Sequence, residues 1–106
     1  MVNLNKENFE EEVLKSDLPV LVDFWGPQCQ PCLALMPFVE NLATKRGGIL
    51  KVTKVEAPWN RRLCLNLKVM GLPTFLLYRY GEEIGRLTGN GITPESLSQW
   101  IDRILG

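Results

Sequence analysis

The sequence predicts an α/β protein in which helices cover both faces of a mixed sheet. Three observations lead to this fold class. Residues 20–25 form a nearly continuous apolar run, which is typical of a central strand. Helical and strand patterns alternate along most of the chain, and residues 74–80 and 83–88 are two strand patterns joined by a tight turn. We expect one domain with one core over residues 1–106.

The first half of the chain contains two predicted helices and two predicted strands. Apolar residues at helical spacing indicate a helix at 6–15, with Asn5 as its N-cap. After the strand at 20–25 the helical spacing resumes, and Pro31 is tolerated in the first turn of this second helix. Basic residues and two glycines end that helix, and the alternating pattern at 49–55 predicts a strand.

The second half of the chain contains one ambiguous segment. Residues 61–68 fit either a helix or a strand by periodicity. A short helix is favoured, because neighbouring parallel strands need a crossover connection. The hairpin at 74–80 and 83–88 follows, and the last helix starts with Thr93 as its cap and Pro94 at its first position.

The composition excludes several classes of function. Lys plus Arg and Asp plus Glu number 12 each, so the zero net charge gives no sign of binding to nucleic acid or to a membrane surface. No apolar run approaches the roughly 20 residues that cross a bilayer, and the N-terminal residues lack the plan of a signal peptide. The absence of His removes most metal sites and the Ser–His and Cys–His catalytic pairs. We therefore expect a cytoplasmic protein that binds neither nucleic acid nor membranes.

Cys29 and Cys32 stand three residues apart, where a strand pattern ends and a helical pattern begins. Residues i and i+3 of a first helical turn lie on the same side, within the Cα separation of about 4.4–6.8 Å that a disulfide needs. Backbone N–H groups and the helix dipole would stabilise a thiolate at Cys29, whereas Cys32 would be more buried. The pattern predicts thiol–disulfide exchange in which Cys29 attacks a target disulfide and Cys32 resolves the mixed disulfide.

Two other interpretations of this cysteine pair stay open. Half of a structural zinc site would need two more ligands, and the sequence offers only Cys64 and no His. Two buried, unreactive thiols are the second alternative. Cys64 itself is interpreted as a small buried hydrophobic residue, with a regulatory or dimerising thiol as the alternative.

The chain resembles the thioredoxin family along nearly its whole length. The resemblance is carried by residues 22–25, the Cys29–Cys32 centre, Pro37 in the following helix, residues 71–74, Gly81 in the turn and Gly89 before the last helix. It implies a thioredoxin fold, which is a central mixed sheet of four or five strands flanked by helices. It also implies a protein-disulfide oxidoreductase that needs no bound cofactor or metal and contributes to cell redox homeostasis.

The resemblance also implies roles for residues outside the cysteine pair. Asp23 matches a buried carboxylate that relays a proton to or from Cys32, and Lys54 matches a lysine close to that carboxylate. Burial independently raises the pKa of such a carboxyl group, although a structural Asp23–Lys54 ion pair is the alternative. Pro73 matches a cis-proline beside the cysteines, where the backbone of Leu72 can pair with a target peptide. A plain turn proline is the alternative for Pro73.

A rim around the cysteine pair is expected to bind target proteins. By resemblance, its residues are Trp25, Gln28, Gln30, Pro31, Leu72, Thr74 and Gly89. Two of these positions depart from the family, which usually has an aromatic residue at position 28 and Gly at position 30. Because Gln30 adds no positive charge beside Cys29, we favour a reductant over an oxidant. Trp59 could add aromatic surface to the rim or lie partly buried in its loop, and Trp25 could belong to the core.

Together these features predict a protein-disulfide reductase of thioredoxin type. The expected partners are disulfide-containing target proteins and a thioredoxin-reductase-type electron donor, and we expect a monomer. A protein-thiol oxidase or isomerase on the same fold is one alternative. A non-catalytic binding module that uses the peptide-pairing edge is the other.

Overall fold

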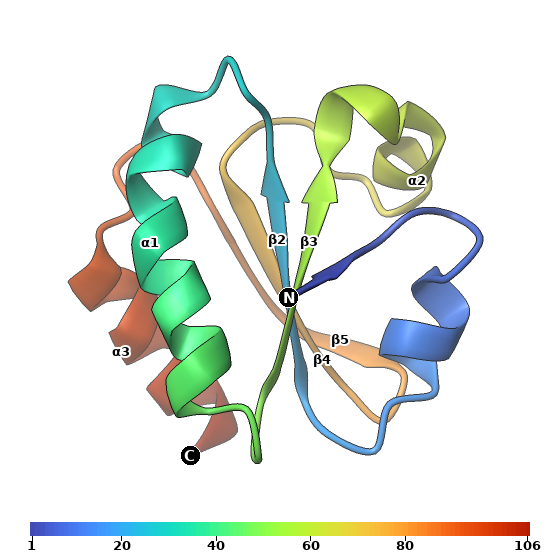
Figure 1. The fold of residues 1–106 in the computed structure, drawn as a ribbon, viewed down its shortest axis with the longest axis vertical. Coiled ribbons are helices and arrows are strands. Elements are labelled where there is room, and N and C mark those ends of the chain that lie inside the picture. Colours follow the sequence, from blue (N-terminus) through green and yellow to red (C-terminus); the bar gives the residue numbers. More distant parts are fainter.

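The computed structural model describes residues 1–106 and contains a five-stranded mixed sheet with the strand order β1-β3-β2-β4-β5 (Figure 1). The strands are β1 (Val2–Asn3), β2 (Val20–Trp25), β3 (Lys51–Glu56), β4 (Thr74–Arg79) and β5 (Glu82–Thr88). The α-helices are α1 (Gln30–Lys45), α2 (Arg61–Asn66) and α3 (Pro94–Leu105), and they are accompanied by a π-helical segment (Glu10–Leu14) and a 3₁₀ turn (Ala57–Trp59). The predicted α/β class with a mixed sheet is confirmed.

Strand β2 lies at the centre of the sheet. It pairs with β3 in parallel and with β4 in antiparallel orientation, and its side chains from Val20 to Phe24 are all buried. A strand that is covered on both faces has no side exposed to solvent, which explains its nearly continuous apolar run. The prediction of a central strand at residues 20–25 is therefore confirmed. The predicted hairpin is also present, because β4 and β5 pair with each other in antiparallel orientation.

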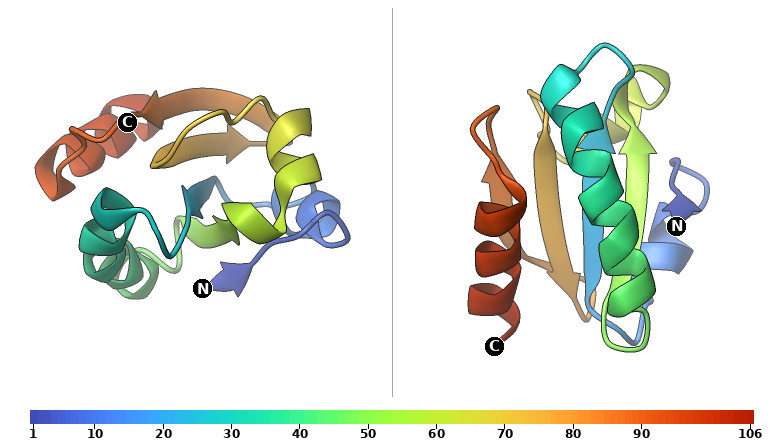
Figure 2. Two further views of the ribbon diagram at one scale, coloured as in Figure 1. Left: turned by 90° about the horizontal axis from the view of Figure 1, so that it is seen from above. Right: turned by 60° about the vertical axis from the view of Figure 1, so that its left-hand side comes forward.

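Helices cover both faces of the sheet, as the two views of Figure 2 show. On one face, Leu21 of β2 packs in a core cluster with apolar residues of α1 and α3. On the other face, Val22 packs in a second cluster with residues of α2 and the π-helical segment. Successive side chains of a strand point to opposite faces, so Asp23 lies on the face that α1 and α3 cover.

The two long helices begin at capping residues. Thr93 caps α3, and it and Ser96 form a capping box in which each side chain accepts the backbone N–H of the other. Cys29 caps α1, so this helix begins at Gln30 and Pro31 lies in its first turn, as expected. The ambiguous segment at 61–68 contains α2, and the favoured helical interpretation is confirmed. None of the helices combines the length and the hydrophobicity that are needed to span a membrane.

The first helix is shorter than predicted. Residues 6–8 form a turn, Phe9 has a helical conformation, and Glu10–Leu14 follows with a π-helical bonding pattern. Asn5 acts as the expected cap, because its Oδ1 accepts the backbone N–H of Asn8 at 3.0 Å. The side chain of Asn8 accepts the N–H of Asn5 and donates to the carbonyl of Asn3. These bonds cap the start of the segment, and the backbone N–H of Phe9 still donates a regular helical bond to the carbonyl of Asn5 at 3.1 Å. At the other end, the N–H of Lys15 bonds to the carbonyl of Glu10 at 3.0 Å, and this wider π-type turn ends the segment.

The substitution Thr93→Ala removes the cap of α3. We expect the free energy of unfolding to fall by about 1 kcal/mol, because a helix N-terminal N–H loses its side-chain acceptor. Urea unfolding followed by circular dichroism measures this change. Ser98→Ala is the matched control within the same helix, and it should change the free energy by less than about 0.5 kcal/mol. Equal losses in the two variants would contradict the capping role of Thr93.

Candidate active site

Cys29 and Cys32 form a disulfide bond at the junction between β2 and α1. Their Cα atoms lie 5.2 Å apart, inside the range that the sequence spacing predicts. The bond excludes the interpretation of two inert, separate thiols in this structure. No group of three or more His, Cys, Asp or Glu side chains is arranged to hold a metal ion.

The two sulfur atoms have different surroundings. Cys29 is half-buried and caps α1, where its Sγ accepts the backbone N–H of Cys32 at 3.2 Å. Cys32 lies one turn into the helix and is only 2% exposed. Donors at a helix N-terminus and the helix dipole stabilise negative charge on the capping sulfur. The predicted asymmetry between an accessible, thiolate-stabilising position and a buried one is therefore present.

Asp23 is a buried carboxylate without a hydrogen-bond partner. It lies near the end of β2 that leads to the cysteines, is 1% exposed, and neither of its oxygens has a hydrogen-bond partner. Burial raises its pKa from an ordinary 3.8 to about 7, because the charged form loses its hydration, while the positive charge of Lys54 acts more weakly in the opposite direction. A carboxyl group with such a pKa can exchange a proton near neutral pH.

Lys54 lies beside Asp23 without forming an ion pair with it. The two residues are register partners in the parallel pair of β2 and β3. The salt bridges of the structure do not include this pair, and the Lys54 ammonium lies 5.6 Å from the centroid of the Trp25 ring. The structural ion pair that the sequence left open is therefore not formed, and desolvation dominates the titration of Asp23.

The Leu72–Pro73 peptide bond is cis, as the sequence predicted for this position. The carbonyl oxygen of Pro73 accepts the backbone N–H of Gly89 at 3.1 Å and the hydroxyl of Thr88 at 3.3 Å. Gly89 has a φ of +122°, a conformation that a side chain would strain, so Gly is needed at this point of the rim. The N–H and C=O groups of Leu72 form no hydrogen bond within the chain.

Gly26 links the cysteine turn to the Leu72 loop, and the sequence predictions missed it. A Cβ atom at Gly26 would stand 3.3 Å from Leu72 Cδ1 and 3.4 Å from Pro58 Cδ. The carbonyl of Gly26 also accepts the N–H of Cys29 at 3.1 Å. The missing side chain thus allows the Leu72 loop to approach the cysteine turn closely. The sequence signal that could have indicated this close approach was the position of Gly26 between Trp25 and Pro27.

The remaining predicted site residues lie at the surface of the β2–α1 loop or around it. Gln28 and Gln30 are exposed, whereas Trp25 and Pro31 are half-buried. Trp25 therefore belongs neither wholly to the core nor wholly to the surface, and its buried Nε1 has no hydrogen-bond partner. The Thr74 side chain is buried and donates a hydrogen bond to the carbonyl of Gly71 at 2.6 Å, so its contribution to the rim is structural.

Trp59 lies in the 3₁₀ turn after β3, and Cys64 lies in α2. Trp59 is 81% exposed, so the alternative of a partly buried loop residue is wrong. It lines a hollow with residues of the N-terminal segment, which include Asn5 and Lys6. Cys64 is a free, buried thiol in the core cluster that contains Val22, and burial raises its pKa. The interpretation of Cys64 as a small buried residue is confirmed.

The chain is similar to known proteins along nearly its whole length. The family model described as Thioredoxin matches residues 1–103. A thioredoxin of Acetoanaerobium sticklandii is 37% identical over 105 residues, which cover 99% of this chain and all of the relative. A thioredoxin of Peptoclostridium acidaminophilum is 38% identical over 106 residues, covering 100% of this chain and 96% of the relative. Thioredoxin 1 of Nostoc sp. is 35% identical over 97 residues, which cover 92% of this chain and 90% of the relative.

The chain belongs to the thioredoxin family. Its fold is the thioredoxin fold, and its activity is that of a thioredoxin-type protein-disulfide reductase with a redox-active disulfide. Within this thioredoxin-family chain, Gln28 and Gln30 flank Cys29, and both are exposed. The two departures from the usual family pattern therefore lie at the surface, on either side of Cys29.

Asp23→Asn should remove a pH dependence of stability. The pKa of Asp23 is raised in the folded chain, so the protonated form supports folding below about pH 4, and this contribution is lost as the pH rises toward 7. The loss amounts to on the order of 4 kcal/mol. We expect the oxidised variant to gain stability relative to the wild type between pH 4 and pH 7 and to stay more stable above pH 7.

Urea unfolding of the oxidised proteins from pH 4 to pH 8 measures this effect. Asp17→Asn is the matched control, because Asp17 is exposed and forms no ion pair. This control should keep the pH profile of the wild type. A difference between Asp23→Asn and wild type that stays constant over the whole pH range would refute the raised pKa.

Proposed function

We propose that Cys29 is the attacking thiol and Cys32 the resolving thiol in the reduction of target disulfides. The observation that carries this proposal is the unequal exposure of the two sulfurs at the N-terminus of α1. Cys29 is accessible and accepts an N–H bond from the helix, whereas Cys32 is buried behind it. A target disulfide can therefore reach Cys29 Sγ directly. The buried Cys32 Sγ can attack only a mixed disulfide that Cys29 has already formed.

The reaction has two exchange steps. In the reduced protein, the Cys29 thiolate attacks one sulfur of the target disulfide, forms a mixed disulfide and releases one target thiolate. Cys32 then loses its proton and attacks Cys29 Sγ, which forms the Cys29–Cys32 disulfide and releases the second target thiolate. Two electrons pass from the dithiol to the target, and the released thiolates take up protons.

Asp23 is the proposed proton carrier for Cys32. Its pKa of about 7 lets it accept the thiol proton during the second step and return a proton during re-reduction. Its oxygens have no hydrogen-bond partner that would hold the carboxylate in its charged form. Lys54 tunes this group, because its positive charge lowers the pKa of Asp23 against the stronger effect of burial.

The Leu72–Pro73 edge is the proposed binding site for the target backbone. The free N–H and C=O groups of Leu72 can pair with an extended peptide, which would then lie as an added strand beside the cysteines. The rim formed by Trp25, Gln28, Gln30, Pro31, Thr74 and Gly89 surrounds this edge. Its polar glutamines offer hydrogen bonds to a target where an aromatic residue and a glycine are usual in the family.

The proposed partners are disulfide-containing proteins and a thioredoxin-reductase-type electron donor. We also propose that residues 1–106 act as a single domain, since both core clusters pack against the same sheet. The one cysteine outside the active pair, Cys64, is buried, which disfavours a disulfide-linked dimer and supports a monomer. The protein is also proposed to be cytoplasmic, and its zero net charge argues against a nucleic-acid or membrane partner.

Cysteine variants test the proposed roles. We expect Cys29→Ser to lower the acceleration of insulin reduction by dithiothreitol at least about 100-fold, because the attacking thiolate is lost. Cys32→Ser should attack targets but stall, so that it accumulates as a mixed disulfide. Mass spectrometry of the trapped species from a native extract would identify the targets. Wild-type rates in Cys29→Ser would overturn the assignment.

Alkylation of the reduced protein at neutral pH distinguishes catalysis from a binding module. We expect iodoacetamide to modify Cys29 rapidly and Cys32 and Cys64 slowly, because only the first combines exposure with a stabilised thiolate. Peptide mapping by mass spectrometry separates the three sites. Equally slow modification of all three thiols would favour a non-catalytic module.

Charge at position 30 should shift the reduction potential in opposite directions. Gln30→Lys places a positive charge beside Cys29, stabilises its thiolate and should raise the potential by about 10–30 mV, whereas Gln30→Glu should lower it. Equilibration with a glutathione redox buffer measures both. For the wild type we expect a value closer to the roughly −270 mV of a reductant than to the roughly −120 mV of a strong oxidant. A wild-type value near the latter would favour the oxidase alternative.

A further inference from the structure

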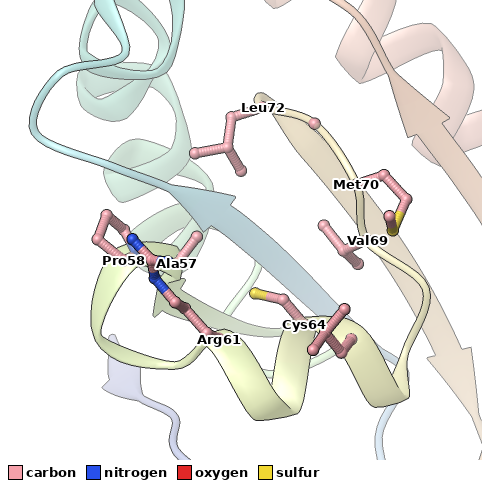
Figure 3. Close-up of a pocket in the computed structure, with 9 residues that line it drawn as sticks. Ala57, Pro58, Arg61, Cys64, Val69, Met70 and Leu72 are labelled. Atoms are coloured by element: carbon pink, nitrogen blue, oxygen red, sulfur yellow. The ribbon is translucent and has the colours of Figure 1, made fainter.

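A pocket of about 410 Å³ opens between α2 and the loop that leads to Pro73. Figure 3 shows Pro58, Cys64, Val69 and Leu72 around this space, with the sulfur of Cys64 directed into it. Most of its lining is apolar, and Leu65 on its α2 side is 61% exposed. Exposed leucine beside an open apolar pocket is available to contact a bound side chain.

The pocket is continuous with the proposed peptide-binding edge. Leu72 lines the pocket and also carries the free backbone groups that can pair with a target strand. Side chains of an extended peptide repeat on one side every second residue, at a spacing of roughly 7 Å. A peptide paired with Leu72 can therefore direct a neighbouring side chain into the pocket while its cysteine meets Cys29.

A positively charged surface adjoins the pocket. Arg61 lines the pocket and also lines a second hollow of about 240 Å³ with Arg62, Lys6 and the exposed Trp59. None of these three cations forms an ion pair in the structure. The second hollow has one acidic lining residue, Glu7, so its charge is positive although the whole chain is neutral. Exposed guanidinium groups without partners bind carboxylates, often in bidentate fashion.

We propose that the surface around α2 selects target segments that carry both an apolar side chain and a carboxylate near the reactive cysteine. The apolar side chain enters the pocket, and the carboxylate binds Arg61 at the edge of the pocket and Arg62 in the adjoining hollow. This inference rests on the proposed function, because the target must first be held at Leu72. An acidic target segment is the occupant that fits both hollows, because its negative charge complements Arg61, Arg62 and Lys6. Arg61 lines both the apolar pocket and the second hollow, so one segment can contact the two.

Three synthetic peptides test this selectivity. Each contains one cysteine, joined in a mixed disulfide to a chromogenic thionitrobenzoate group, and they differ at the second and fourth residues from that cysteine. The second and fourth residues are Leu and Glu in the first peptide, Leu and Lys in the second, and Ser and Ser in the third. One series places these residues on the N-terminal side of the cysteine, and another series places them on the C-terminal side. The reduced protein cleaves the mixed disulfide into two thiols and becomes oxidised, and dithiothreitol re-reduces it.

In one of the two series we expect kcat/KM for the Leu–Glu peptide to exceed that for the Ser–Ser peptide about tenfold. The Leu–Lys peptide should lie between them, since surface charge pairs contribute factors of a few. The double substitution Arg61→Glu and Arg62→Glu should reverse the preference between Glu and Lys. Leu65→Ala should lower the rate of both Leu peptides about threefold and leave the Ser–Ser peptide unchanged.

Two controls separate selectivity from chemistry. Arg103→Glu changes the charge of an exposed residue on α3 and should keep the wild-type order of the peptides. A small aromatic disulfide without a peptide should be reduced equally by all variants. Failure of the wild type to reduce even this compound would refute the proposed function instead of the selectivity alone.

Two results would overturn the selectivity. The first is equal rates for the three peptides in both series while the small disulfide is still reduced. The second is an unchanged Glu-over-Lys preference in the doubly charge-reversed variant. If that variant altered only the rate of re-reduction by a thioredoxin reductase, the surface would belong to the electron donor, and the proposal for targets would be wrong.

Discussion

The position of β2 in the middle of the sheet is the constraint on which the site depends. Hydrogen bonds on both edges and core packing on both faces hold this strand rigidly. Its last residues place Asp23 on the face that α1 covers and Trp25 in a half-buried position, and Gly26 and Cys29 lie in the turn that follows. A sulfur at the end of a fixed strand and the start of a helix keeps a constant geometry relative to the buried carboxyl group of Asp23, the proposed proton carrier.

Burial of Asp23 links stability to function in this protein. The desolvation of its carboxylate outweighs the attraction of Lys54, whose ammonium group lies over Trp25 instead of bonding to Asp23. Ionisation of such a group costs free energy of folding at neutral pH, and the same cost gives it a pKa suited to proton exchange. A shorter distance to Lys54 would stabilise the charged form of Asp23 and lower its pKa away from the range that the proposed proton transfer needs.

Much of the fold could be predicted because its signals are local. The apolar run of β2, the capping sequence at Thr93 and the hairpin pattern each depend on neighbouring residues. The first helix was predicted too long, because apolar spacing does not show where regular helical bonds give way to the wider bonds of a π-helical turn. Gly26 was missed because its role depends on a contact with Leu72, which is distant in sequence.

The sequence by itself determined the reactive pair, since the i, i+3 spacing of Cys29 and Cys32 and the helix start between them are local geometry. The tertiary structure alone decided how the rest of the chain serves that pair. It separated Asp23 from an ion pair with Lys54 and joined the Arg61 side of α2 to the Leu72 edge. These relationships join distant segments, and their distances are set by the packing of the whole core, which periodicity and spacing do not encode.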